Sequence, residues 1–261
     1  MNAVNRWFLL PLMFLVGCAG MFEGSLRPLE AGPDRQEVFQ ALSQKELTIR
    51  TLRGLFQASI SGSGVPVSQK ILGTVSYVHP DVLDLKGFIR MGVPVMNFHR
   101  RGNDYELYVP SEDKVITGRV DAPQEHSPWD HTVMLSLRAL DAVLGKVSGV
   151  SSEEAVVWKN NEHYRIDLAS TQSSFTSSQD DFTVRTWVDA RTMDLTSIEY
   201  RRSFDDIVVF VECEDYREVK TPTSKESSLV RLPFLVRATD YRINGGSITL
   251  RFKEFIVNAA S

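Results

Sequence analysis

The stretch TLRGLFQASIS, residues 51–61, alternates apolar and polar side chains with a period of two. One face carries Leu52, Phe56, Ala58 and Ile60, and the other carries Arg53, Gln57 and Ser59. Successive side chains of a β-strand point to opposite faces, so the pattern predicts a strand with one buried and one solvated face. Such strands are typical of antiparallel sheets.

Three later segments repeat this pattern. Their apolar faces group Ile71 with Val75 and Tyr77, Leu83 with Leu85 and Ile89, and Tyr105 with Leu107 and Val109. Turn-forming residues separate the segments at 61–66, 79–81 and 101–104. Four amphipathic strands joined by such turns predict an antiparallel meander.

A helical period interrupts the strands in residues 127–145. Val133, Leu137 and Leu140 recur at helical spacing, and Gly145 follows as a helix-ending residue. A second helix is expected nearer the N-terminus. There Asp34 is the expected N-cap with Glu37 as its capping-box partner, and the apolar positions are Val38, Leu42, Leu47 and Ile49.

Strands resume after the helix at 127–145, with turns expected at 160–161, 189–194 and 244–246. In the last segment, the side chains expected on one face are Ile248, Leu250, Phe252 and Ile256. About ten to eleven strands and two helices follow from these patterns. The chain shows no alternation of single strands with helices, so the predicted fold class is mainly β (α+β) with an antiparallel sheet.

The N-terminus has the pattern of an export signal. Its apolar run, residues 7–17, is 11 residues long and contains Pro11, whereas a membrane-spanning helix needs about 20. The run follows Arg6 and ends in LVGC, which resembles a bacterial lipobox whose cysteine is lipidated. The alternative is an ordinary signal peptide with an incidental cysteine.

The resulting division of the chain has three parts. Residues 1–17 are the expected lipoprotein signal peptide, 18–33 the lipidated Cys18 with a flexible tether, and 34–261 a single domain. Cys213 is then the one remaining thiol, so no intramolecular disulfide is expected. Its place within VECED suggests a small buried hydrophobe on a strand.

The chemistry-bearing residues show no catalytic or metal-binding pattern. His126 and His131 are the closest histidine pair, but they are five residues apart and Pro128 lies between them. The sequence has no HExxH, no GxSxG and no phosphate-binding loop. Its 29 basic and 33 acidic side chains form no basic block, which argues against nucleic-acid binding. We therefore expect no enzyme activity, no catalytic residue, no metal and no cofactor.

One loop is unusually apolar. GFIRMGVPV, residues 87–95, places Phe88, Ile89, Met91 and Val93 around two glycines, where a tight turn is normally polar. An exposed tip would contact a membrane or a ligand, whereas a tucked-in bend would belong to the core. The sequence leaves both alternatives open.

In these features the chain resembles the lipoprotein-localisation (LolA/LolB) superfamily, over roughly residues 34–257. The resemblance rests on the element order and on LRGLFQASISGSG, on the stretch from VLDLKGFIRMGVPV to YELYVP, and on the closing LPFLVRATDYRINGGSITLRFKEFIVN. It implies a half-open antiparallel β-barrel with a helical lid over an apolar cavity. The superfamily's cavity arginine lacks a clear counterpart, because Arg53 falls on the polar face of its strand.

If the interior is hollow, its expected lining residues are those on the apolar faces of the strands and of the lid: Phe56, Ile60, Val75, Tyr77, Leu83, Leu85, Tyr105, Leu107, Leu137, Leu140, Leu250 and Phe252. Periodicity cannot distinguish such a cavity from a closed core. Ala19 follows the lipobox cysteine in place of Asp, which resembles outer-membrane sorting in enteric bacteria.

The expected protein is therefore a periplasm-facing, outer-membrane lipoprotein that binds acyl chains or another hydrophobic ligand. Receiving or localising lipoproteins is one form of this role. The alternative is a structural or assembly accessory lipoprotein that acts through contacts with other envelope proteins.

Overall fold

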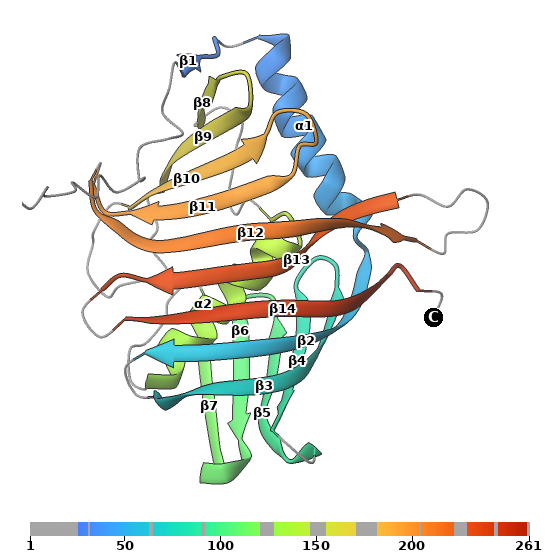
Figure 1. Ribbon diagram of the computed structural model, residues 1–261, viewed down its shortest axis with the longest axis vertical. Coiled ribbons are helices and arrows are strands. Elements are labelled where there is room, and N and C mark those ends of the chain that lie inside the picture. The colour runs from blue at the N-terminus through green and yellow to red at the C-terminus, as the bar shows by residue number, and fades with distance from the viewer. Residues whose placement is uncertain are drawn as a thin grey trace, which may run out of the picture.

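The computed structural model describes residues 26–30, 32–62, 65–89, 92–120, 128–146, 155–170, 182–203, 205–221, 229–242 and 245–259. The predicted signal peptide and Cys18 lie outside these ranges. The described part is mainly β, with one antiparallel sheet of 14 strands and two α-helices (Figure 1). The expectation of ten to eleven strands is too low.

The sheet is open, and its spatial order is β1-β8-β9-β10-β11-β12-β13-β14-β2-β3-β4-β5-β6-β7. The strands and helices have the bounds β1 (Arg27–Pro28), α1 (Pro33–Thr48), β2 (Thr51–Gly62), β3 (Val65–Val78), β4 (Val82–Phe88), β5 (Pro94–Arg101), β6 (Asp104–Val109), β7 (Lys114–Arg119), α2 (Pro128–Val143), β8 (Ala155–Lys159), β9 (His163–Ser170), β10 (Phe182–Asp189), β11 (Leu195–Arg201), β12 (Ile207–Lys220), β13 (Leu229–Asp240) and β14 (Gly246–Val257).

The additional strands are those with weak alternation. β1 has only two residues and lies in the stretch predicted to be tether. β5 and β7 read PVMNFHRR and KVITGR, which lack a clean period of two. Each of them forms by pairing with a neighbouring strand: β1 pairs with β8, β5 with β4, and β7 with β6.

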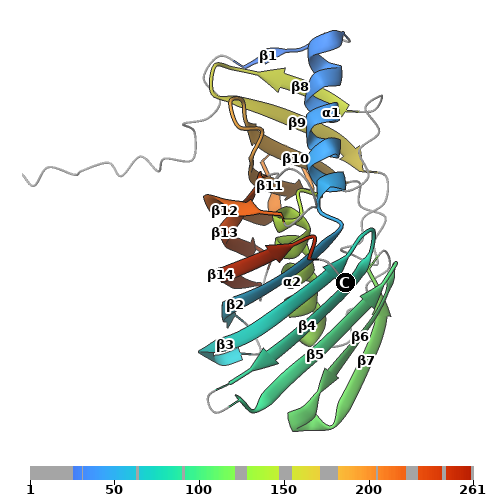
Figure 2. The same cartoon turned by 90° about the vertical axis from the view of Figure 1, so that its right-hand side faces the viewer.

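The sheet curves around α2. Figure 2 shows the strands from β2 to β7 wrapping round one side of the helix, with β12–β14 on the other. The inner face carries the core, and the predicted alternation of 51–61 is confirmed, because Leu52, Phe56, Ala58 and Ile60 are all buried. Arg53 is exposed on the outer face, as expected.

The last strand departs from the predicted alternation. A register shift between Phe252 and Glu254 in the pairing with β2 reverses the phase of the strand. Beyond it Phe255 and Val257 are buried, while Ile256 is 48% exposed. The expectation that Ile256 shares the face of Phe252 is therefore wrong, because one bulge residue turns every later side chain over.

The first helix also differs in detail from the prediction. α1 starts at Pro33 with Gly32 as its N-cap, so Asp34 lies inside the first turn and makes no capping bond. Val38 and Leu42 are buried in the core as expected, but Leu47 is half-exposed. Proline at the helix start takes the place of the predicted capping box, because its fixed φ suits the first helical position.

Two contacts hold α1 to the sheet. The Lys45 ammonium lies 2.5 Å from a carboxylate oxygen of Asp194, in the β10–β11 turn, and the other carboxylate oxygen accepts a 2.9 Å hydrogen bond from Arg231. At the C-terminal end of α1, the Asn258 side chain accepts hydrogen bonds from the backbone N–H groups of Arg50 and Thr51. The residues that follow β14 therefore contact the residues that join α1 to β2.

Candidate functional site

The candidate site is the apolar space between α2 and the inner face of the sheet. α2 packs on β12, β13 and β14. Val133, Leu137 and Leu140 are buried, as their helical spacing predicts. The helix ends before Gly145, whose φ of +70° is the left-handed conformation that favours glycine after a helix.

The structure brings all the predicted lining residues together. Every one is buried, and all belong to one hydrophobic cluster: Phe56, Ile60, Val75, Tyr77, Leu83, Leu85, Tyr105, Leu107, Leu137, Leu140, Leu250 and Phe252. Within this cluster, Phe56 of β2 meets Phe252 of β14 edge to face, with ring centroids 5.9 Å apart. The residues are placed as a site would need them, while their contact with a ligand stays a prediction.

The space left beneath α2 is small. Between Val133 and Leu137 of the helix and Leu85, Phe98 and Leu107 of the sheet, a cavity of about 10 Å³ remains. Small-molecule sites usually measure about 300–1,000 Å³. This part of the interior is therefore closed, and a ligand could enter it only if α2 moved away from β4–β6.

Charged side chains fasten the C-terminal end of α2 to the turns of the sheet. Lys146 lies 3.1 Å from an Asp81 carboxylate oxygen and donates to the Pro80 carbonyl oxygen. Arg100 lies 3.7 Å from Asp141 and 3.8 Å from Asp81. We call Asp81, Arg100, Asp141 and Lys146 the latch, because they connect the lid helix and the residues that end it to the β3–β4 turn and β5.

The latch environment shifts two pKa values. Burial alone would lower the pKa of Lys146, but the negative charge of Asp141 and contacts with Tyr77 and Asp81 raise it overall. Burial raises the pKa of Tyr77, whose hydroxyl donates a 2.8 Å hydrogen bond to the Pro80 carbonyl. Lys146 also lies over the Tyr77 ring, 5.0 Å from its centroid. The lysine is therefore charged at neutral pH.

The apolar loop between β4 and β5 is partly exposed at its described residues. Ile89 is 39% and Val93 51% exposed, and Phe88 is half-buried, while Met91 lies outside the described residues. The Ile89 N–H donates to the Val93 carbonyl oxygen at 3.0 Å. Of the two alternatives that the sequence leaves open, the exposed tip holds for Ile89 and Val93.

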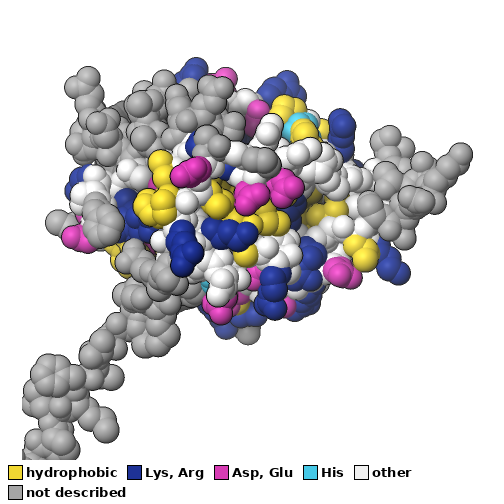
Figure 3. Space-filling model, turned by 90° about the horizontal axis from the view of Figure 1, so that it is seen from above, with side chains coloured by type: hydrophobic (Ala, Val, Ile, Leu, Met, Phe, Trp, Pro, Cys, Tyr) yellow, Lys and Arg dark blue, Asp and Glu magenta, His cyan; other side chains and the backbone are white. Residues whose placement is uncertain are grey.

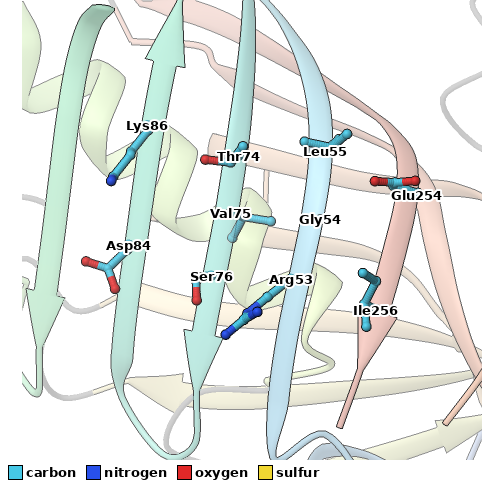
Figure 4. A pocket seen from close by; sticks show the side chains of 10 residues that line it. All are labelled: Arg53, Gly54, Leu55, Thr74, Val75, Ser76, Asp84, Lys86, Glu254 and Ile256. Atoms are coloured by element: carbon cyan, nitrogen blue, oxygen red, sulfur yellow. The ribbon is translucent and has the colours of Figure 1, made fainter. Parts of the chain in front are cut away.

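A second hollow lies on the outer face of the sheet, across β14, β2, β3 and β4 (Figure 4). It has a volume of about 470 Å³, and the residues that line it are Arg53, Gly54, Leu55, Thr74, Val75, Ser76, Asp84, Lys86, Glu254 and Ile256. Its charges are mixed, and it is open to solvent. Two of its lining residues, Glu254 and Ile256, follow the register shift in β14.

The other groups singled out in the sequence show no catalytic arrangement among the described residues. Cys213 lies on β12, and burial raises the pKa of its thiol to about 12, in agreement with its prediction as a buried hydrophobe. His99 and Asp84 are 2.7 Å apart on the exposed face. In the described ranges, no group of three His, Cys, Asp or Glu side chains could hold a metal ion, and no helix is long and apolar enough to cross a membrane.

The latch is the part of the site that sequence reasoning missed. Asp81 and Lys146 are 65 residues apart in the chain, so no local period relates them. The only local signal is the position of Lys146 directly after the helix-ending Gly145, since cations there interact favourably with helix carbonyl groups.

Comparison with known proteins identifies the fold. No protein-family model and no curated protein sequence matches the chain. Among solved structures, a domain from Vibrio parahaemolyticus assigned to outer membrane lipoprotein sorting is similar, with a TM-score of 0.55 and 11% identity over 86% of this chain and 92% of that one.

Two further structures agree. A DUF1329 family protein from Desulfovibrio piger has a TM-score of 0.56 and 14% identity, over 87% of this chain and 93% of that one. A LolA superfamily protein from Nitrosomonas europaea has a TM-score of 0.51 and 11% identity, over 85% and 94%. The class is thus a curved antiparallel sheet that holds a helix in its hollow. More specifically, the chain shares its fold with these structures, one of which is a LolA superfamily protein.

Proposed function

We propose that the protein is a lipid-anchored, periplasm-facing carrier or receptor of the outer membrane, held by a lipid on Cys18, that binds acyl chains in the interior beneath α2. Lipoproteins are one source of such chains. The observation that carries the proposal is the polar latch over an apolar interior. α2 is buried from Val133 to Val143, so its displacement gives up apolar contacts that a bound chain would replace, and the latch adds the charged contacts at its end.

The cluster supplies the affinity that such a role requires. Burial of one methylene group contributes about 0.8 kcal/mol, so an acyl chain that replaces α2 against β4–β6 recovers the apolar contacts that the helix gives up. The proposed role is binding without catalysis.

The test removes the charges of the latch and measures uptake of a fluorescent fatty acid. Arg100→Met with Lys146→Met is expected to raise the uptake rate about tenfold, because loss of roughly 1.4 kcal/mol of lid contacts changes the opening equilibrium by that factor. The matched control is Arg101→Met with Lys253→Met, which removes two exposed charges from the sheet. No uptake by any of the three proteins would contradict the proposal.

A second candidate function is favoured by the small space beneath α2 at β4–β6 and by the exposure of Ile89 and Val93. In that case the protein is an assembly accessory, and Ile89 and Val93 contact another envelope protein. A photo-crosslinker at Val93 that captures one stoichiometric envelope partner, together with absent fatty-acid uptake, would favour it.

A further inference from the structure

The chain enters the fold at one end of the sheet. β1 forms the sheet edge there, with Arg27 opposite Lys159 and Pro28 opposite Trp158 in β8. The Leu29 N–H adds a 2.8 Å hydrogen bond to the Val157 carbonyl. Figure 1 shows β1, β8 and the start of α1 together at the top of the molecule.

The surface of this end has an apolar centre. Val156 is 49% exposed, and Trp158, on the same face of β8, is partly exposed. We call Arg27, Pro28, Val156 and Trp158 the tether end. Figure 3, which looks down on it, shows hydrophobic side chains gathered between acidic and basic ones. Because both signs of charge surround the centre, its partner is selected by apolar contact rather than by net charge.

The exposed loop lies at the opposite end. In the sheet order, β4 is nine strands away from β8, which corresponds to about 43 Å along the curved sheet at ~4.8 Å per strand. Figures 1 and 2 both place the β4–β5 connection at the bottom of the molecule, far from β1.

The length of chain before β1 limits how far the tether end can lie from the membrane. Cys18 and Leu26 are eight residues apart, and eight extended residues span at most about 29 Å. A lipid on Cys18 therefore holds the tether end near the bilayer, with apolar side chains exposed on it.

We infer that the tether end docks on the lipid surface. The protein is then oriented with the tether end against the membrane and with Ile89 and Val93 directed away from it. The inference rests on the proposed lipid anchor. It gives the two apolar surfaces different partners: the tether end contacts the membrane that holds the anchor, and the loop meets a partner that arrives from the periplasm.

The experiment measures energy transfer to headgroup-labelled lipids in vesicles that carry the full, lipidated chain. A donor dye is attached at Asn161→Cys, beside the tether end, or at Val93→Cys in the loop. Cys213 does not compete for the dye, because it is buried and its thiol has a pKa of about 12. Transfer is expected to be efficient from residue 161 and at least threefold weaker from residue 93. Transfer from residue 93 that equals or exceeds that from residue 161 would overturn the upright orientation.

A variant with a longer linker distinguishes docking of the tether end from simple tethering by the lipid. With ten Gly/Ser residues inserted after Gly20, transfer from residue 161 is expected to persist. Val156→Glu is expected to reduce it at least twofold in the lengthened protein, whereas the matched Val115→Glu, also at an exposed valine but on β7, leaves it unchanged. Loss of transfer by lengthening alone, or equal effects of the two substitutions, would overturn docking.

Failure of the anchor gives a different result. A chain that does not float with vesicles, and whose Cys18 carries no lipid by mass spectrometry, contradicts the proposed anchor and the orientation together. A floating, lipidated chain with the transfer pattern reversed contradicts the orientation alone.

Discussion

At the scale of single residues, a glycine of β3 admits an aromatic side chain of the candidate site. A Cβ atom on Gly73 would lie 2.4 Å from the ring of Phe56 and 2.8 Å from the Lys86 carbonyl oxygen. The backbone cannot retreat, because Gly73 is paired on both sides. Phe56 can occupy the inner face only because its cross-strand neighbour has no side chain.

Gly73→Ala is therefore expected to lower the free energy of unfolding by about 2 kcal/mol, as overpacking of a core does. Urea denaturation followed by tryptophan fluorescence measures the change. Ser76→Ala, on the solvated face of the same strand, is the control and should stay within about 0.5 kcal/mol of the parent. A neutral Gly73→Ala would mean that Phe56 is not packed against this glycine.

A second residue-scale feature is the turn between β10 and β11. One carboxylate oxygen of Asp189 accepts hydrogen bonds from the backbone N–H groups of Arg191 and Thr192, both at 2.9 Å. The hydrogen bond from the Thr192 N–H, more than the other contacts, lowers the pKa of Asp189 below its ordinary value of about 3.8. The charged form is thus favoured by folding.

A lowered pKa contributes stability that is present above the unfolded pKa and is lost as pH falls through the folded one. Asp189→Ala should cost about 1 kcal/mol at pH 7, and the cost should shrink below pH ~3.8. Asp189→Asn keeps an acceptor and should remove the pH dependence while it retains part of the stability. A cost for Asp189→Ala that is constant from pH 7 to pH 3 would contradict this account.

At the scale of elements, Asp194 connects α1 to the sheet. Its side chain is almost fully buried and accepts from Lys45 of α1 and Arg231 of β13. Burial of a carboxylate is costly unless it is paired, so both cations are part of the same arrangement. The β10–β11 turn therefore fixes the position of the first helix.

Asp194→Ala is expected to lower the free energy of unfolding by about 2 kcal/mol, because it removes the charged hydrogen bonds from Lys45 and Arg231, both of which stay partly solvated. Asp205→Ala, at an exposed turn position, is the matched control. Thermal denaturation followed by circular dichroism compares the two. Equal melting temperatures would show that α1 docks through Val38 and Leu42 alone.

The elements also show how far sequence reasoning reaches. The alternation in β2, β3, β4 and β6 predicts which residues are buried, because a period of two leaves little choice of face. It fails at Ile89, which is 39% exposed although the pattern predicts it on the face of Leu83 and Leu85. It also fails at Ile256, where a bulge in β14 reverses the phase, and at β5 and β7, whose pairing is imposed by neighbours. The candidate lining is predictable for the same reason as the core. The latch is not, since it joins residues that only the fold brings together.

At the scale of the whole molecule, the open sheet and α2 share one hydrophobic core. α2 covers the hollow between β12–β14 and β4–β6, and only about 10 Å³ remains beneath it at β4–β6. The same residues thus serve as a core when α2 is seated and as a lining when it is displaced. Sequence patterns cannot separate these two states, because they specify an apolar face and not what lies against it.

The most direct test of the proposed function is native mass spectrometry of the protein expressed from residue 19 onward, without its anchor, in the presence of palmitic acid. The account predicts a 1:1 complex, which forms more readily when Arg100 and Lys146 are both replaced by methionine. The absence of any complex, both with the intact latch and without it, would contradict the claim that the interior opens to an acyl chain.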